Sequence, residues 1–385
     1  MLYTNETLYA IQKDNNEKIT IKSIQILRAI AALMVAYFHS TDRGGVNLLP
    51  HTGAFGVDIF FVISGFVIAS MGYQDSKYFF IKRVFRILPL YIIATSIMIV
   101  ICIIFPEKIN RTVVNLPAFI KSILFIPYKM ESNVSILQQG WTLNVPILQQ
   151  GWSLNFEMFF YLIMAICIAT VKNKKYLGIV CALTLSSIFT ILNVINSDLF
   201  ALKYYQKSLF PEFIYGIILF YIYTFLKGKN KEYLLIKNDI MNMIIFGIIG
   251  FVSFMYLVGD NFYKWSIMYS RNIFWGIPSL FLVFAFLNIE RQIKNNCIIN
   301  FFIKMGDASY VLYLFHTFII SFFTRLLFIK IIANSSNLII SVLVNIVVMA
   351  SSIVGSIVIY NIIDKPIHKY LKNVFYRKIE KRQLQ

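Results

Sequence analysis

Ten apolar segments of about 17–24 residues divide this chain, and each is long enough to cross a bilayer as an α-helix. A helix satisfies its own backbone hydrogen bonds inside lipid, so segments of this length constrain the fold strongly. We expect an all-α, polytopic transmembrane helix bundle. The spans are predicted at about 24–41, 55–73, 87–105, 152–171, 176–195, 208–226, 240–258, 271–289, 309–329 and 337–360.

The composition supports a membrane protein. Of the 385 residues, 58% are hydrophobic and 14% are charged, whereas soluble domains are about 45–50% apolar and about 25% charged. We expect one transmembrane domain over residues 23–364, between a cytoplasmic segment at 1–22 and a basic cytoplasmic tail at 365–385. The first twenty residues lack the apolar core and cleavage site of a secretory signal, so the first span is predicted to remain as an uncleaved anchor.

The distribution of positive charge predicts the orientation. With the amino terminus in the cytoplasm, 24 of the 36 Lys and Arg residues fall in cytoplasmic segments, 10 fall in external segments, and Arg28 and Arg325 lie within spans. This excess follows the positive-inside rule, and an even number of spans places both termini in the cytoplasm. The net charge of +18 is therefore first a topology signal, with anionic-lipid contact by the tail as a secondary consequence. No basic soluble module suggests nucleic-acid binding.

Cysteine and histidine spacing gives no sign of a metal site. The four cysteines, Cys102, Cys167, Cys181 and Cys297, have no CxxC spacing, and we interpret them as packing residues rather than as a disulfide framework. The sequence has no HExxH-type spacing and no glycine-rich nucleotide motif. We expect neither a bound metal nor a permanently bound cofactor.

The longest predicted connection, at about 106–151, lies on the external side and leads into a tandem duplication. Residues 136–146 (ILQQGWTLNVP) are followed at once by residues 147–157 (ILQQGWSLNFE). Only the second copy ends in a carboxylate, Glu157, while Pro146 holds that place in the first copy. Because surface loops tolerate insertions, we expect the second copy to fill the structural position and the first to be additional loop.

The first span carries two ionisable residues, Arg28 and His39, eleven positions apart. At about 100° per residue they share one helix face, and they stand about 16 Å apart along the axis. Ionisable groups in a membrane usually face a bundle interior or an aqueous cavity. His39 is predicted to be a catalytic acid–base residue, with a packing role as the alternative. Arg28 is predicted to orient an anionic ligand or a carboxylate, or else to form a structural ion pair or extend to the interface.

Two further spans bring carboxylates to the expected depth of His39. Asp58, near the external end of the second span, is predicted to orient the imidazole. Glu157, in the fourth span, is predicted to pair with histidine or bind substrate hydroxyls, or else to be an interfacial acid below an anchoring Trp152. The pair 64–65, Ser-Gly, favours close helix packing instead.

Basic and aromatic residues near two other spans are further candidates. Arg83 and Arg86 stand i, i+3 before the third span and are predicted to point to the same side. Two guanidinium groups suit phosphate binding, while ordinary positive-inside charge is the alternative. In the ninth span His316 follows Tyr310, and it is either a second acid–base group or a buried hydrogen-bonding residue.

Taken together, five of these segments resemble the integral-membrane acyltransferase family three, which includes bacterial polysaccharide O-acetyltransferases. They occur in the family's order over about residues 22–365, and the fourth is most similar to the branch that acts on exopolysaccharides. The segments are LRAIAA at 27–32 with His39 after it, GVDIFFVISGF at 56–66, RVFRILPLY at 83–91, GWSLNFE at 151–157 and SYVLYLFH at 309–316.

The resemblance implies an O-acyltransferase in the bacterial inner membrane. It implies acyl-CoA, in particular acetyl-CoA, as a cytoplasmic co-substrate and a hydroxyl of a polysaccharide or lipid-linked glycan as the acceptor. His39 would be the essential acid–base residue with Arg28 in support, and Arg83 and Arg86 would hold the donor's phosphates. Asp58 and Glu157 join the expected catalytic set, and Trp152, Tyr310 and His316 are candidates for substrate contact. The duplication before Glu157 departs from the family pattern.

Two other function classes share these features. A transporter or flippase of lipid-linked glycan also needs many spans and intramembrane charges, but such proteins often contain inverted repeats, and the only repeat here is eleven residues long. A structural subunit of an export machine would depend on none of these ionisable residues individually. The oligomeric state is not specified by the sequence.

Overall fold

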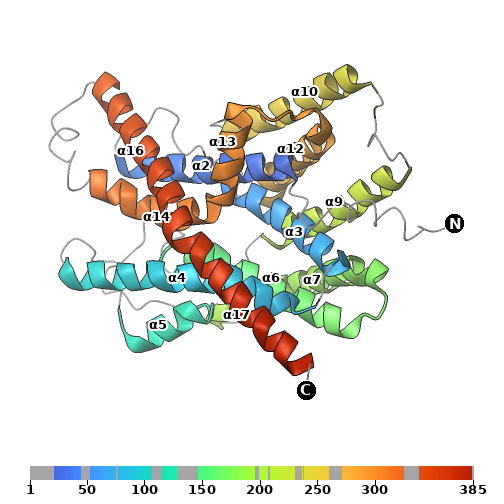
Figure 1. Cartoon of the computed structure of the whole chain (residues 1–385), viewed down its shortest axis with the longest axis horizontal. Coiled ribbons are helices and arrows are strands. Elements are labelled where there is room, and N and C mark those ends of the chain that lie inside the picture. Colours follow the sequence, from blue (N-terminus) through green and yellow to red (C-terminus); the bar gives the residue numbers. More distant parts are fainter. Residues whose placement is uncertain are drawn as a thin grey trace.

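The computed structural model describes residues 21–44, 53–74, 77–105, 114–128, 146–195, 199–206, 209–229, 236, 238–259, 271–324 and 338–383. Within these ranges the chain is helical and contains no β-strand, which confirms the all-α prediction for this part (Figure 1). The longer helices are α2 (Lys22–Gly44), α3 (Gly56–Gln74), α4 (Phe79–Ile104), α6 (Gly151–Thr170), α7 (Leu177–Val194), α9 (Phe210–Lys229), α10 (Asp239–Val258), α12 (Ile277–Asn288), α13 (Cys297–Asp307), α14 (Ser309–Phe322), α16 (Leu338–Ile359) and α17 (Lys365–Gln383). Shorter elements are α5 (Leu116–Ile123), α8 (Phe200–Tyr205), the 3-10 turns η2 (Lys174–Tyr176) and η4 (Glu290–Gln292), and the π turns η3 (Asn272–Gly276) and η6 (Tyr360–Asp364).

The described residues do not confirm the predicted count of ten spans. The described residues contain eight helices that are long and apolar enough to cross a membrane, or nine if the bent pair α13–α14 forms one span. The predicted span at 271–289 corresponds to the helix Asn272–Asn288, which is shorter than a standard span. The predicted span at 309–329 begins after a 77° bend between α13 and α14 and is described only to residue 324. The orientation of the termini stays a prediction.

Two predicted boundaries also differ from the observed helices. Helix α4 begins at Phe79 rather than at about 87, so Arg83 and Arg86 lie on the helix itself. The last predicted span ends at about 360, but the helix continues through η6 into α17, and Ile339–Phe375 forms one stretch of 37 residues. Figure 1 shows α16 and α17 as a single rod across the molecule. The expected basic tail is therefore helical and continuous with the membrane domain.

Helix α3 lies at the centre of the bundle and packs on α2, α6, α7, α9 and α12. Its closest crossing is with α9, where a side chain added at Gly65 would place Cβ 2.0 Å from the carbonyl oxygen of Phe213. At the same crossing, a Cβ on Gly216 would lie 2.0 Å from the carbonyl oxygen of Val62. Two backbones can approach this closely only where neither residue has a side chain. The packing role predicted for Gly65 is confirmed.

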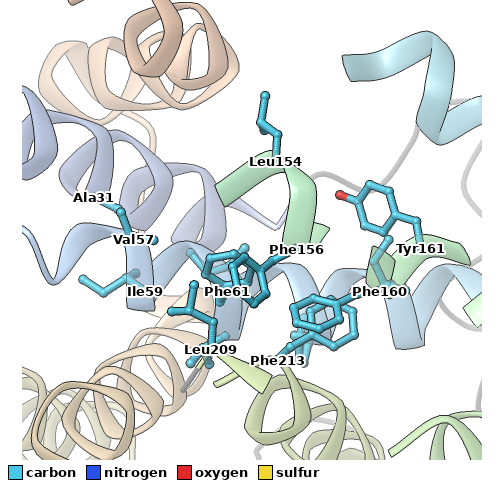
Figure 2. Close-up of a cluster of buried hydrophobic side chains, with 14 of the residues drawn as sticks. Ala31, Val57, Ile59, Phe61, Leu154, Phe156, Phe160, Tyr161, Leu209 and Phe213 are labelled. Carbon is cyan, nitrogen blue, oxygen red and sulfur yellow. The ribbon is translucent and has the colours of Figure 1, made fainter. Parts of the chain in front are cut away.

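An aromatic layer fills the space beside this crossing (Figure 2). Phe160 lies at its centre, with ring centroids 4.6 Å from Phe213 and 5.9 Å from Phe61. Phe156 adds a stacked contact of 5.1 Å with Tyr204. These rings come from α3, α6, α8 and α9, so the layer fixes the position of α6, which carries the second copy of the duplicated segment.

The glycine crossing generates a stability prediction. Gly65→Ala and Gly216→Ala should each destabilise the protein by about 1–3 kcal/mol, because the added methyl group meets backbone that has no room to move. Thermal unfolding of the detergent-solubilised protein measures the effect as a lower midpoint. Gly247→Ala is the matched control, since no heavy atom lies within 4 Å of a Cβ at Gly247. Equal midpoints for all three variants would contradict the inferred packing.

Candidate active site

Helix α2 presents His39 toward the interior of the bundle. The ring centroid of His39 lies 5.1 Å from that of His316 on α14, with 30° between the planes, and His316 is fully buried. Nδ1 of His316 lies 3.0 Å from the carbonyl oxygen of Leu312. Because a carbonyl oxygen only accepts, Nδ1 carries the proton in this contact and Nε2 is the acceptor nitrogen of the neutral ring. The structure therefore brings together the two histidines singled out in the sequence.

A network of hydroxyl and amide groups continues from this pair into α6. The Tyr313 hydroxyl, one turn before His316, is 2.5 Å from Oγ of Ser153 and donates to the carbonyl oxygen of Gln150 at 3.3 Å. The side-chain amide of Gln150 donates to the hydroxyl of Thr317 at 2.7 Å. All of these bonds are buried. They tie α14 to the start of α6 and surround the histidine pair with polar groups.

Glu157 lies one turn further along α6 than Ser153. Its Oε1 accepts hydrogen bonds from the hydroxyls of Tyr161 and Ser64, the latter at 3.4 Å. It also interacts electrostatically with Arg83 and Arg28. The sequence suggested that Glu157 pairs with a histidine or binds substrate hydroxyls. Within the protein, its hydrogen-bond partners are two hydroxyls, and the nearby positive charge comes from two arginines. Those partners satisfy a carboxylate more fully than one imidazole would, because they supply both hydrogen bonds and positive charge.

Three arginines, Arg28, Arg83 and Arg86, lie in the part of the bundle around Glu157. Arg28 donates from Nη1 to Oε1 of Gln25 at 3.4 Å and interacts electrostatically with Arg86, Asp307 and Glu157. The arginines therefore form a positively charged region into which the carboxylates of Glu157 and Asp307 are set. Charged groups so close together need anionic partners, which either the protein or a ligand must supply.

The two arginines of α4 have different neighbours. Arg83 lies with Cζ 6.0 Å from the ring centroid of Tyr161. Arg86 forms an ion pair with Asp364 at 3.1 Å and lies with Cζ 5.7 Å from the ring centroid of Tyr310. The Tyr310 hydroxyl in turn donates to the carbonyl oxygen of Ile87 at 2.8 Å. Tyr310, expected near the substrate, thus supports Arg86 and the backbone beside it.

Asp58 does not have the partner that the sequence suggested. It was expected to orient His39, but it is fully buried and takes two hydrogen bonds from Arg271, one from Nε at 2.9 Å and one from Nη2 at 2.7 Å. A guanidinium fork matches a carboxylate in two bonds, which explains the preference. Arg271 also lies with Cζ 4.7 Å from the ring centroid of Trp275. The buried pair joins α3 to the segment that begins the predicted eighth span.

Two residues of the charged cluster around Asp58 were missed by the sequence analysis. Arg271 was counted only as an external topology charge, and Glu212, in the first turn of α9, was not considered. Glu212 is fully buried and interacts electrostatically with Asp58 and Arg271. The available signal was the position of each residue at the edge of a predicted span, where a charge is costly unless it is paired.

The remaining candidates lie away from the histidine pair. The carbonyl oxygen of Trp152 accepts a hydrogen bond from Tyr204 at 2.5 Å, and its ring lies 6.4 Å from that of Phe156, in the aromatic layer. A cavity near Lys172 and Lys174 lies beyond the carboxyl end of α6, whereas Ser153 and Glu157 lie near its amino end. Among the residues that the structure describes, no three His, Cys, Asp or Glu side chains are grouped so as to hold a metal ion.

Comparison with known proteins identifies the class of reaction that the chain's family carries out. The family model described as "Acyltransferase domain" matches residues 21–361. This chain belongs to that acyltransferase family. The match includes every helix that carries the histidines and arginines described above, and most of the chain lies within it.

Individual relatives share less than a third of their aligned residues with this chain. The chain is 29% identical over 294 residues to the exopolysaccharide production protein ExoZ of Rhizobium meliloti (strain 1021), covering 74% of this chain and 81% of ExoZ. It is also 24% identical over 323 residues to a Staphylococcus aureus (strain COL) protein that is named as an O-acetyltransferase on a provisional basis. The alignment covers 78% of this chain. This chain spans 51% of that protein. No solved structure matches the chain.

The duplicated segment generates a prediction about the site. The second copy supplies Gln150, Ser153 and Glu157 to the networks above, whereas positions 136–145 of the first copy lie outside the described residues. Deleting residues 136–146 restores a single copy after Ser135. This variant should keep its membrane level and its acyl transfer activity within about twofold of the parent, since loop insertions contribute little to stability.

The matched control is a deletion of the same length in the second copy. Removing residues 147–157 moves Pro146 to the place of Glu157, which removes the carboxylate and puts proline inside the first turns of α6, at a cost of about 3 kcal/mol or more. Activity should be lost in this variant. If the two deletions behave alike, the assignment of the second copy to the structural position is wrong.

Proposed function

We propose that this protein is an O-acyltransferase of the bacterial inner membrane that moves an acyl group, in particular acetyl, from cytoplasmic acyl-CoA to a hydroxyl of a cell-surface or exported polysaccharide. Membership of the acyltransferase family supports the reaction class. The printed name of ExoZ supports an exopolysaccharide as the acceptor. The observation that carries the proposal is the close contact of His39 with His316 inside a bundle of this family.

His39 is the general base in this mechanism. Its neutral imidazole takes the proton of the acceptor hydroxyl as the oxygen attacks the thioester carbonyl. The tetrahedral intermediate collapses, the carbon–sulfur bond breaks, and the imidazolium returns the proton to the leaving thiolate of CoA. The products are an ester and free CoA thiol, so the proton balance is closed. An acyl-enzyme step before attack by the sugar is compatible with the same residues.

His316 is the ring neighbour of the base in this mechanism. The bond from Nδ1 of His316 to Leu312 fixes the orientation of that ring, and Tyr313 and Ser153 extend the polar surroundings toward Glu157. Glu157 in turn interacts electrostatically with Arg28 and Arg83. In the proposed mechanism the thioester arm of the donor lies between these arginines and the histidine pair, with the acyl carbon at His39.

The basic end is the proposed entrance for the donor. Arg83 and Arg86 carry guanidinium groups suited to phosphate, and the positive-inside pattern predicts that this end faces the cytoplasm, where acyl-CoA is made. Arg28 would contribute positive charge deeper along the same path.

Replacing His39 tests the base. His39→Ala and His39→Gln should lower glycan acylation by about 10²–10⁴-fold, the usual contribution of a general base, while protein levels stay unchanged. Mass spectrometry of the surface polysaccharide and transfer of labelled acetyl groups from acetyl-CoA measure the effect. Ser40→Ala is the control, because it breaks the 2.8 Å bond from α2 to Asn345 but keeps the imidazole. Normal acylation in both His39 variants would reject the mechanism.

The same assay separates acyl transfer from glycan transport. If purified protein moves no label from acetyl-CoA to glycan, yet cells without it fail to export the glycan, the chain is a transporter rather than an enzyme. Loss of acetyl groups with export intact supports the enzyme.

Replacing the two arginines of α4 tests the donor site. Arg83→Ala with Arg86→Ala should raise the KM for acyl-CoA at least tenfold, since each charge-assisted hydrogen bond to phosphate contributes about 1.5–3 kcal/mol. Lys82→Ala removes a neighbouring charge from the same helix and should change KM by less than about threefold. If both changes altered the KM for acyl-CoA equally, the two arginines would contribute to membrane topology and not to donor binding.

A further inference from the structure

Asp364 is a buried acidic residue that forms an ion pair with Arg86. It is the only carboxylate between Leu338 and Phe375 in the sequence. It ends the π turn η6, and its side chain is 2% exposed. Single π turns within α-helices often occur at functional sites, because they change the direction in which the following side chains point. The buried carboxylate therefore requires an explanation beyond helix packing.

The two oxygens of this carboxylate have separate partners. Oδ2 lies 3.1 Å from Nη1 of Arg86, and Oδ1 lies 3.0 Å from Nε2 of His368 one turn further along the helix. Arg86 is 30% exposed and has the Tyr310 ring beside it. Asp364 bonds to one nitrogen of a group that has five N–H donors in a rigid fork. The carboxylate therefore holds one edge of the guanidinium and leaves the other edge for a ligand.

The helices that carry this ion pair are also fixed against each other. Phe375 on α17 packs edge-to-face on Tyr78 and Phe85, with ring centroids 5.1 Å and 5.7 Å apart. Both partners lie at the start of α4, on either side of Arg83 in the sequence. This packing fixes the position of Asp364 relative to Arg83 and Arg86.

From this geometry we infer that Asp364 is a positioning residue of the acyl-donor site, which holds Arg86 in the orientation that binds a donor phosphate. The inference rests on the proposed function. Arginine side chains lose considerable rotamer freedom when they bind, and a partner that fixes the side chain beforehand lowers this cost. Nε2 of His368 lies 3.0 Å from the other oxygen of the carboxylate and occupies that side of it. Asp364 itself does not touch the donor.

Two donors provide the test, one with and one without the phosphate-bearing nucleotide of CoA. Full-length protein in detergent is assayed by release of thiol from acetyl-CoA and from S-acetylpantetheine, which lacks the nucleotide and its phosphates, with alkali-deacetylated surface polysaccharide from the producing bacterium as acceptor. Asp364→Asn should raise the KM for acetyl-CoA about tenfold, leave kcat within twofold, and leave the KM for S-acetylpantetheine unchanged. Asp364→Glu should recover part of the affinity because it restores the charge.

A matched variant and a double variant complete the design. Asp239→Asn makes the same chemical change at an exposed carboxylate that bonds Gln292 at 3.0 Å on another helix, and it should leave both donors unaffected. In Arg86→Gln the further change Asp364→Asn should add less than twofold to KM, because the two residues act through one contact.

Each other outcome overturns the inference. An unchanged or lower KM for acetyl-CoA in Asp364→Asn means that the carboxylate has no part in binding or competes with the donor. An equal rise for both donors, or a fall in kcat alone, means that it acts on the fold rather than through phosphate. If the parent protein turns over neither donor, the proposed function itself fails, and this result is distinct from a variant that matches an active parent.

Discussion

Burying a charge among apolar helices is costly, and the arrangement of this bundle follows from how each buried charge is compensated. Asp58 takes both arms of the Arg271 guanidinium, with bonds of 2.9 Å and 2.7 Å, while Asp364 holds Arg86 at 3.1 Å. Each pair joins helices that are far apart in the sequence. An unpaired partner left behind in such a site costs several kcal/mol. Ion pairs therefore fix α3 against the start of the η3 segment, and α4 against the rod formed by α16 and α17.

The features that sequence analysis predicted well depend on local pattern. Segment hydrophobicity located the helices, because a span needs about twenty apolar residues whatever its neighbours are. Helical periodicity placed Arg28 and His39 on one face, and small residues identified the crossing at Gly65. The sequence also predicted that the second copy of the repeat enters a helix, because Glu157 suits the interior of a helix and Pro146 does not.

The features that were missed depend on pairing between distant segments. Nothing within the first four spans indicates that Asp58 finds Arg271 more than two hundred positions later, and a charge counted for topology gives no sign that it is buried. Similarly, Arg86 was expected to share its surroundings with Arg83, but the neighbours differ because α6 faces one residue and α14 with η6 faces the other. The span at 271–289 was predicted from hydrophobicity alone, which does not reveal the π turn at Asn272–Gly276 that interrupts the regular α-helix there.

The continuous helix from Ile339 to Phe375 has a mechanical consequence. At 1.5 Å per residue it is about 55 Å long, against about 30 Å for the hydrocarbon interior of a bilayer. The surplus has to project beyond the lipid or be absorbed by inclination of the whole rod. Because Asp364 pairs with Arg86, and Phe375 packs on Tyr78 and Phe85, α4 has to follow any change in the inclination of the rod. The thickness of the surrounding lipid therefore bears on the inclination of the two helices together.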